Sequence, residues 1–337
     1  MAYMKITSTD SLFFGGGKPF DSSHDSWTDS TFLPNPSVLW GALFSVLYRE
    51  KRINIVNGKV SEEERKKLNI KNIYLYNEEQ TTVLTPAPLD IFVDSDGKNY
   101  ISKYRDLDFI SNYPLEVISS IDTDREVNPL ENHFIEINSL YQHYTKKYAK
   151  NLILYNFDDL FVADYKIGIE IDKESKIAKD KHLYRIDLTQ FKKDWSFLVE
   201  YDCDIEFKES GLLKLGGEGK TAQYKKIEKP IGLESADKTK SKILEELEDA
   251  KYFKVLFKTP AYFKNGWKPN HSNLVCANVG KYISIGGFDM ETNRPKKMNR
   301  YVPAGSVYVF KKDGKMVISN KDNESYKGFG SFEYLTI

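Results

Sequence analysis

The sequence predicts an α+β protein with two domains, each an antiparallel sheet that carries helices on one face. Three observations support this prediction. The chain has 337 residues, which is enough for about two domains. Segments with alternating apolar residues outnumber segments with a helical period. A charged stretch over residues 224–251 lies between two regions rich in such segments. We therefore expect one domain over residues 1–225 and a second over residues 226–337.

The composition restricts both function and location. The 49 basic and 49 acidic residues give a net charge of zero. Free nucleic-acid-binding proteins are usually basic overall, so contact with a nucleic acid must rest on local patches. With 22 Tyr and 20 Phe, many rings must be partly exposed, which favours a stacking or assembly surface. Cys203 and Cys276 exclude a disulfide framework. Because signal-peptide and membrane-spanning patterns are absent, we expect a soluble, cytoplasmic protein that makes no membrane contact.

The N-terminal stretch is predicted to be a strand, a glycine loop and a buried helix. The strand covers Lys5–Ser8 and continues to Phe14. The helix covers Val38–Tyr48, with Ser37 as its N-cap and with Gly41 marking a place where another backbone packs closely. Glycines let the backbone approach a ligand, and successive N–H groups can bind an anion. The loop is therefore either an anion site or a surface turn, and it contains Gly15, Gly16, Gly17, Lys18, Pro19 and Phe20.

The next region mixes short elements with polar segments. The sequence predicts a capped helix from Ser61 to Leu68, a strand over Ile73–Tyr76, an extended segment over Val83–Val93, a turn over Asp94–Gly97, irregular structure over residues 100–137, and a helix over Ser139–Lys150. The turn faintly resembles a calcium loop. However, Lys103 stands where such a loop needs a glutamate, which argues against calcium.

A hairpin and a second glycine loop follow. The strands Lys166–Asp172 and Leu183–Ile186 flank a basic turn that contains Lys176. A third strand, Trp195–Phe207, alternates and is expected to be half-buried. The second glycine loop contains Gly216, Gly217, Gly219 and Lys220. It imitates the end of a phosphate-binding P-loop, but the first glycine is missing and little room remains for the helix that such a loop needs.

The C-terminal region is predicted to contain one exposed helix and several strands. The helix covers Asp237–Ala250 with Ile243, Leu244 and Leu247 facing inward. The strands cover Tyr252–Phe257, Tyr282–Ile285 and Val302–Phe310. Four positive charges gather within seven residues between the last two strands, at Arg294, Lys296, Lys297 and Arg300. Such a cluster is either a solvated surface or a local patch for a polyanion.

At this point several segments resemble one family in a single order. The family is the third Cmr subunit, a RAMP-superfamily member of type III-B (Cmr) CRISPR effector complexes. Each segment alone is a weak signal, but the ordered series is specific. The matching segments are Gly17–Phe20, Pro34–Ser37, Pro86–Asp90, Lys166–Ile169, Leu215–Lys220, Thr259–Pro269, Gly286–Asp289 and Val302–Tyr308. The chain differs from the family where arginines are common, because it has lysine at 18, 166 and 220.

The resemblance implies two ferredoxin-like (RRM-like) domains with long insertions. It implies a subunit that holds the 5′ tag of the CRISPR RNA (crRNA). Because none of the five histidines sits in a recognisable catalytic pairing, we expect a binding subunit without catalytic activity, cofactor or metal. Its implied protein partners are the large polymerase-type subunit and the neighbouring RAMP backbone subunits. Because single-stranded RNA is bound through phosphates, rings and base edges, we expect Lys18, Phe20, Lys166, Lys176, Lys220 and the Arg294–Arg300 cluster to border the RNA.

Two alternative functions remain open at this stage. A stand-alone RAMP ribonuclease would use His, Tyr or Lys as acid and base, and His182 beside the lysine-rich turn is the best-placed histidine. An NTPase would use Gly219–Thr221 as a phosphate loop. Cleavage of repeat RNA in EDTA favours the first alternative, and thermal stabilisation by ATP favours the second.

Overall fold

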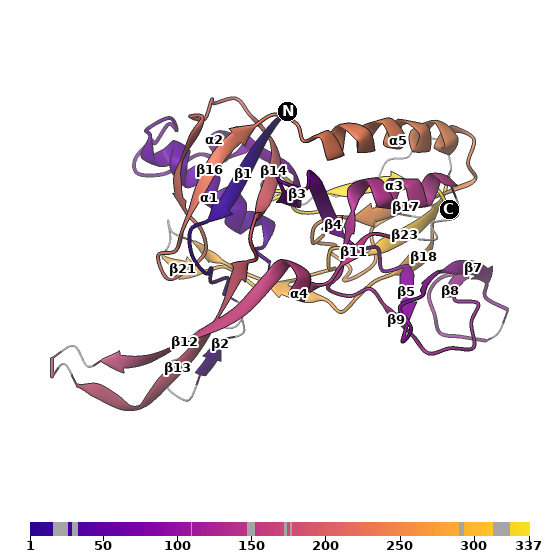
Figure 1. Ribbon diagram of the computed structural model, residues 1–337, viewed down its shortest axis with the longest axis horizontal. Helices are drawn as coiled ribbons and strands as arrows, with labels where there is room; N and C mark the ends of the chain where they lie inside the picture. Colours follow the sequence, from indigo (N-terminus) through magenta and orange to yellow (C-terminus); the bar gives the residue numbers. More distant parts are fainter. Residues whose placement is uncertain are drawn as a thin grey trace.

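An eight-stranded antiparallel sheet organises the first two thirds of the chain in the computed structural model (Figure 1). The structure describes residues 1–15, 26–28, 33–108, 110–146, 152–171, 174–175, 177–271, 273–289, 293–312 and 324–337. The strand order is β11-β10-β4-β3-β14-β1-β16-β15. The strands are β1 (Ala2–Ser8), β3 (Leu68–Asn77), β4 (Thr82–Pro86), β10 (Phe134–Glu136), β11 (Leu154–Tyr155), β14 (Trp195–Cys203), β15 (Ser210–Lys214) and β16 (Thr221–Ile227).

Helices cover both faces of this large sheet. One face packs on α1 (Pro36–Arg49), because Met4, Ile6 and Phe197 share a hydrophobic core with the apolar side of that helix. The opposite face packs on α3 (Ile137–Lys146) and α5 (Ile231–Glu248). The central strand β14 is therefore buried on both sides. The expectation of a half-buried strand here was wrong, because alternation along a strand does not reveal a second covering layer.

The start of α1 differs from the sequence prediction in two details. Asn35, not Ser37, occupies the N-cap position, and Pro36 takes the first helical turn. Proline suits that position because its missing N–H has no partner there anyway. Gly41 has open space around the position of a Cβ atom, so the expected close backbone neighbour is absent there. The helix itself, with seven buried residues, is confirmed.

A four-stranded antiparallel sheet organises the rest of the chain. Its order is β18-β23-β17-β24, which places the strands second-third-first-fourth in chain order. The inner strands β3-β14-β1-β16 of the large sheet follow the same order. The strands of the smaller sheet are β17 (Tyr252–Phe257), β18 (Leu274–Asn278), β23 (Val307–Lys311) and β24 (Phe332–Leu335). The predicted α+β class is thus confirmed at the level of mostly antiparallel sheets with few helices.

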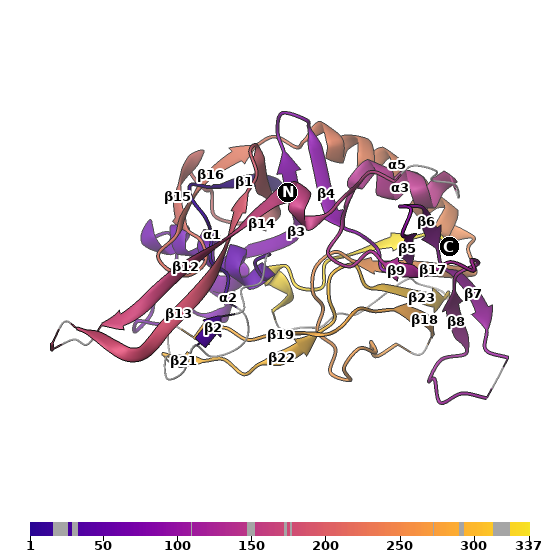
Figure 2. The ribbon, with the colours of Figure 1, turned by 60° about the horizontal axis from the view of Figure 1, so that its bottom comes forward.

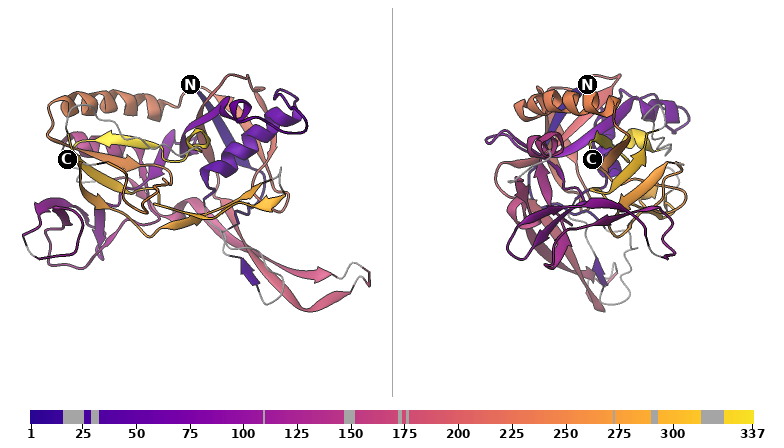
Figure 3. Two further views of the ribbon diagram at one scale, coloured as in Figure 1. Left: turned by 180° about the vertical axis from the view of Figure 1, so that it is seen from behind. Right: turned by 90° about the vertical axis from the view of Figure 1, so that its right-hand side faces the viewer.

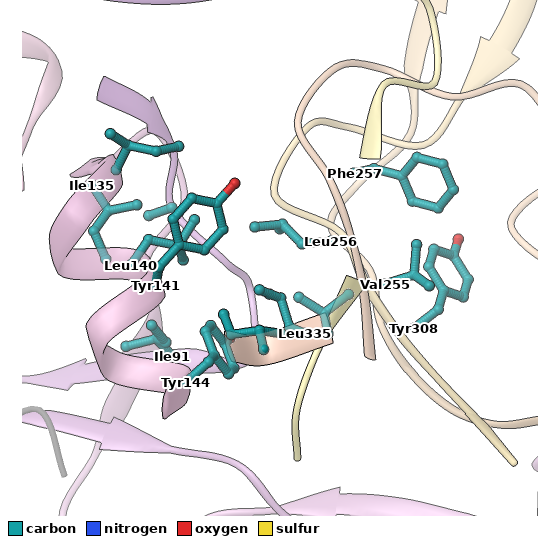
Figure 4. Packing of buried hydrophobic residues seen from close by; sticks show 14 of the residues in the cluster. Ile91, Ile135, Leu140, Tyr141, Tyr144, Val255, Leu256, Phe257, Tyr308 and Leu335 are labelled. Atoms are coloured by element: carbon teal, nitrogen blue, oxygen red, sulfur yellow. The ribbon is translucent and has the colours of Figure 1, made fainter. Parts of the chain in front are cut away.

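The two sheets share one continuous core. Leu140 and Tyr144 of α3 belong to the same buried cluster as Leu256 of β17 and Leu335 of β24. Figure 4 shows these side chains meeting between α3 and the C-terminal strands. The helix α5 begins six residues before the predicted start and buries Ile243 and Leu247, whereas Leu244 is 39 % exposed and does not face inward as expected.

Residues 91–130 form an insertion of short strands. They pair as β6-β5-β9 and β7-β8, with β5 (Ile91–Asp94), β6 (Asn99–Ile101), β7 (Lys103–Asp106), β8 (Val117–Ser120) and β9 (Val127–Pro129). The prediction of irregular structure over residues 100–137 was therefore wrong where these strands lie, whereas residues 110–116 and 121–126 contain no helix or strand. Strands of three or four residues are too short to show a period in the sequence. In the turn after β5, the Asp94 carboxylate accepts hydrogen bonds from two backbone N–H groups, Tyr100 and Arg125.

A long hairpin projects from the body of the molecule (Figures 1 and 2). It consists of β12 (Phe161–Ile171) and β13 (Ala178–Phe191), and β13 also pairs in parallel with β2 (Ser26–Thr28). The predicted hairpin is confirmed, and both strands are longer than the sequence indicated. The short helix α4 (Phe157–Leu160), with a capping box at Asn156, leads into it.

A narrow ribbon extends from the smaller sheet towards α1 (Figure 3, left). It contains the strand pairs β19 (Ile283–Ile285) with β22 (Asn299–Tyr301) and β20 (Phe288–Asp289) with β21 (Arg294–Pro295). The remaining elements are α2 (Glu62–Lys66) and the 3-10 turn η1 (Ser325–Lys327). Within the described ranges, no helix is long and apolar enough to cross a membrane.

Candidate nucleic-acid interface

The second glycine loop packs directly against the segment that leads to the first. The Gly217 N–H donates to the Phe13 carbonyl at 2.9 Å, and Lys220 N–H donates to the Gly217 carbonyl at 3.2 Å. Gly216 has φ +78°, and a Cβ there would lie 2.2 Å from the Phe13 carbonyl oxygen. These glycines are therefore needed for close packing between two chain segments. Gly15 ends the described part of the first loop, beside the Phe13 ring.

The lysines of this region are held by neighbouring carboxylates. Lys220 Nζ lies 2.9 Å from Asp10 Oδ2 and 3.4 Å from Ser11 Oγ. The hydrogen bond from Lys220 lowers the pKa of Asp10 below its ordinary value. Lys166 Nζ lies 4.0 Å from Glu218 Oε2, and its side chain is 59 % exposed. The structure thus brings Lys166, Lys220, Gly15 and the second loop together, and we call this group the glycine-loop cluster. Gly16, Gly17, Lys18, Pro19, Phe20 and Lys176 lie outside the described residues.

The four cations near residue 300 form a second group on the ribbon. Arg294, Lys296, Lys297 and Arg300 are all exposed. The Arg300 guanidinium lies 4.6 Å from the centre of the Tyr282 ring, and Lys296 Nζ lies 3.4 Å from Glu324 Oε1. Figures 1 and 3 place β21 at the end of the molecule where the β12–β13 hairpin leaves the body. We call these four residues the ribbon cations.

A cleft of about 490 Å³ opens between the two sheets, and sequence reasoning did not place it in the site. Five prolines that are far apart in the chain line it, namely Pro34, Pro36, Pro86, Pro260 and Pro303. We call it the proline cleft. Its volume lies in the range typical of ligand pockets. The segments around these prolines are four of the segments that carry the family resemblance. The prolines in these segments were therefore the feature of the sequence from which the cleft could have been located.

Main-chain contacts explain why these motifs meet. The Gly305 N–H donates to the Phe257 carbonyl at 2.7 Å, and the Gly305 carbonyl accepts from Leu89 N–H at 2.8 Å. Gly305 has φ +88°, and a Cβ there would lie 2.5 Å from the Ala87 carbonyl oxygen. Only glycine fits such an approach without displacement of the backbone. The motif over residues 302–308 is thereby fixed against the motif over residues 86–90.

The wall of the proline cleft is mostly apolar, and the polar and charged side chains that line it differ in their exposure. Lys258 lines it, but its Nζ lies 2.5 Å from Glu333 Oε1 and the side chain is only 1 % exposed. Burial raises the pKa of Glu333, but Lys258 and Lys240 outweigh burial and lower it overall. Lys281 and Ser284 line the cleft and are exposed. Ser284 pairs across the ribbon with Arg300, so the ribbon cations begin at the rim of the cleft.

A buried ion pair connects the motif over residues 86–90 with strand β17. Lys254 Nζ lies 2.7 Å from Asp90 Oδ2, with both side chains almost fully buried. The Tyr144 and Tyr104 hydroxyls donate to Asp90 at 3.0 and 3.2 Å. Burial raises the pKa of Asp90, but the Lys254 ammonium and these hydrogen bonds outweigh it, so the pKa lies below its ordinary value. Asp90 thus joins the N-terminal motif to β17.

Two alternative functions, an NTPase with a P-loop and a ribonuclease with a catalytic histidine, make specific demands on the structure. Thr221 begins the strand β16 and not a helix, so Gly219–Thr221 does not form a P-loop. His143 is buried, and burial lowers its pKa to about 4. His133 Nδ1 lies 2.9 Å from the Glu131 carbonyl oxygen. The side chain of His182 and all of His24 lie outside the part that the structure describes. Among the described side chains, no group of three metal-ligating residues is found.

Substitution of Gly216 is expected to show that the second glycine loop is needed for packing. Gly216→Ala should destabilise the fold by at least about 2 kcal/mol, because it adds backbone strain to a collision with Phe13. Gly219→Ala is the matched control, since Gly219 also has a positive φ, +68°, but open space around it. Urea unfolding measures both. Equal losses for the two variants would contradict the packing role of Gly216.

Comparisons with known proteins identify similar folds and one matching family. A chain in a cryo-EM structure of type III-B Cmr-beta bound to cognate target RNA and AMPPnP superimposes with a TM-score of 0.53 at 16 % identity, over 91 % of this chain and 86 % of that chain. A second such structure, bound to cognate target RNA, gives a TM-score of 0.52 at 16 % identity over the same shares. These two likenesses establish a shared fold. No curated protein sequence matches significantly.

The model of one family matches almost the whole chain, over residues 4–336, and its description is CRISPR-associated protein (Cas_Cmr3). The match covers both sheets, the hairpin and the ribbon. The resemblance noted in the sequence is thereby confirmed. The chain belongs to the Cas_Cmr3 family of CRISPR-associated proteins.

Proposed function

We propose that this chain is a crRNA-binding subunit of a type III-B CRISPR effector complex. In this role it holds the 5′ tag of the crRNA and docks the large polymerase-type subunit and the neighbouring RAMP subunits. It has no catalytic role of its own. The observation that carries the proposal is the convergence of four family motifs on the proline cleft, whose rim continues into the ribbon cations. The similar structures are type III-B assemblies bound to target RNA, which supports an RNA-associated role.

The geometry supplies the contacts that single-stranded RNA needs. The apolar wall of the cleft suits an unstacked base, and the ribbon cations suit successive phosphates. The glycine-loop cluster adds Lys166 and Lys220, whose present partners Glu218 and Asp10 are part-exposed and can be exchanged for phosphate oxygens. The bound tag is proposed to run from the cleft along the ribbon. The repeated second-third-first-fourth strand order supports two ferredoxin-like domains with a boundary near residue 226.

Co-purification tests this proposal most directly. The chain is expressed with its genomic neighbours, and any RNA that purifies with it is sequenced. We expect short guide RNAs with one common 5′ end, together with a large protein subunit. Assembly of the neighbours without this chain, with the same RNA at the same occupancy, would refute the proposal.

Removal of the ribbon cations is expected to weaken tag binding in a salt-dependent way. Alanine at Arg294, Lys296, Lys297 and Arg300 removes up to four phosphate contacts, and each contact contributes about 0.7 to the slope of log affinity against log salt. Fluorescence titration with labelled tag RNA at several salt concentrations measures this slope. The matched control replaces four exposed lysines elsewhere, Lys59, Lys66, Lys98 and Lys238. An equal loss of slope in the control would show that the binding is not localised to the ribbon.

A further inference from the structure

The ribbon carries an exposed tyrosine beside the proline cleft. Tyr282 is 49 % exposed, and its neighbours in the chain, Lys281 and Ile283, both line the cleft. One face of this part of the ribbon is buried, because Ile285 and Tyr301 belong to a small hydrophobic cluster. The Tyr282 ring does not belong to that cluster and lies towards the outside.

An arginine guanidinium covers this ring from one side. The central carbon of the Arg300 guanidinium lies 4.6 Å from the centre of the Tyr282 ring. In the ladder between β19 and β22, Arg300 pairs with Ser284, so Tyr282 is its diagonal neighbour on the same face of the ribbon. A cation at this distance is attracted to the electron-rich face of the ring. The contact therefore orients the ring before a ligand arrives, which lowers the entropy cost of binding.

The pair offers two contacts that suit one nucleotide. A guanidinium that stacks on a ring through its flat face keeps N–H groups at its edge, where they can bind a phosphate. Lys296 faces Glu324, whereas no carboxylate among the described residues pairs with Arg300. Every nucleobase has a flat face that can stack on an aromatic ring. The exposed part of the Tyr282 ring is therefore suited to a base, and the edge of the Arg300 guanidinium to its phosphate.

We propose that Tyr282 and Arg300 form a subsite for one nucleotide of the bound RNA, with the base stacked on the tyrosine ring and the phosphate bound to the guanidinium. This inference rests on the proposed function, and it adds a stacking position outside the proline cleft. Stacking and phosphate contacts do not depend on the identity of the base, so the subsite positions the RNA without reading its sequence.

The charge around this subsite favours RNA over a protein partner. Exposed tyrosines also occur at protein interfaces, where the polar tip and the apolar ring are both used. The cores of such interfaces, however, are depleted of lysine. Lys281, Lys296 and Lys297 are all exposed on the same ribbon. A strand of RNA supplies both the phosphates for these cations and the base for the ring.

Fluorescence of a base analogue tests the subsite directly. Guide RNAs with 2-aminopurine at one tag position at a time, in the sequence found by co-purification, are assembled with this chain and its partner subunits. Stacking on an aromatic ring quenches this analogue. We expect strong quenching at one position, and Tyr282→Leu should abolish it and lower RNA affinity at least five-fold. Tyr282→Phe keeps the ring and should restore both. Tyr48→Leu is the matched control, because Tyr48 is 47 % exposed on α1, and it should behave as wild type.

A second substitution separates the stacking contact from the charge. Arg300→Lys keeps the positive charge but removes the flat group that covers the Tyr282 ring. We expect the salt dependence of RNA binding to stay as in wild type, while the quenching at the same tag position becomes weaker. Unchanged quenching in Arg300→Lys would show that the guanidinium does not orient the ring.

The remaining outcomes distinguish this inference from the proposed function. Unchanged quenching at every tag position in Tyr282→Leu would overturn the inference and leave the proposed function standing, because the cleft and the other ribbon cations can still hold the tag. Loss of a protein subunit from the Tyr282→Leu complex, with the quenching retained, would also overturn it and would assign Tyr282 to a protein contact. Failure of the wild-type chain to assemble with guide RNA would refute the proposed function and this inference together.

Discussion

Asp90→Asn is expected to destabilise the folded chain by about 3–5 kcal/mol, the largest effect of any single substitution considered. The substitution removes the negative charge but keeps the volume of the side chain. It leaves the Lys254 ammonium buried and without its carboxylate, while two tyrosine hydroxyls lose their charged acceptor. Urea unfolding followed by circular dichroism measures the loss. A change below about 1 kcal/mol would show that the buried pair contributes little to the stability of the fold.

Two further variants define the origin of this effect. Asp96→Asn is the matched control, because Asp96 also forms an ion pair, with Arg125, but its side chain is 69 % exposed. Surface pairs contribute little, so we expect a loss below about 1 kcal/mol. The double variant Asp90→Leu/Lys254→Met removes both charges and should recover most of the stability lost in Asp90→Asn. Failure of this recovery would assign the loss to the tyrosine hydrogen bonds.

The contribution of Asp90 to the stability of the fold is expected to depend on pH, because the pKa of Asp90 is lowered in the folded state. A carboxylate whose pKa is lower in the folded state stabilises the fold fully above its unfolded pKa of about 4. Its contribution is lost as the pH falls through the lower folded value. The stability difference between wild type and Asp90→Asn should therefore be constant from pH 7 to pH 5 and shrink only below about pH 4. Measurement of unfolding at several pH values checks this.

Obstruction of the proline cleft is expected to reduce tag binding at least ten-fold. Ser284→Trp places an indole ring at an exposed position that lines the cleft. The ring occupies the space that we assign to an unstacked base, and base stacking contributes about 1–3 kcal/mol per base. Ser284→Ala should bind as wild type, because it adds no bulk. Titration with labelled tag RNA, in the chain co-expressed with its neighbours, measures both variants.

A second tryptophan variant separates a local block from a general surface effect. Ser235 lies exposed on α5, outside the residues that line the cleft. Ser235→Trp should leave tag affinity unchanged. If Ser284→Trp folds normally and binds the tag as tightly as wild type, the RNA does not enter the proline cleft, although it can still contact the ribbon cations.

The sequence by itself determined the fold class and most of the regular elements. Alternation in Lys166–Asp172 and Leu183–Ile186 predicted the hairpin, because a strand's side-chain period is local and needs no knowledge of its neighbours. The long apolar run after Pro36 predicted α1 for the same reason. Sequence order also predicted the family, since an ordered series of short motifs is a one-dimensional property.

Tertiary structure alone decided where those motifs meet. Pro34, Pro86, Pro260 and Pro303 line one cleft only because the two sheets share a core across α3 and β17. No local pattern records that Lys254 lies against Asp90, or that β14 is covered on both faces, since these depend on contacts between residues far apart in the chain. Likewise, the sequence marks Gly216 as a flexible position, but only the approach of the Phe13 carbonyl shows that glycine is required there by packing.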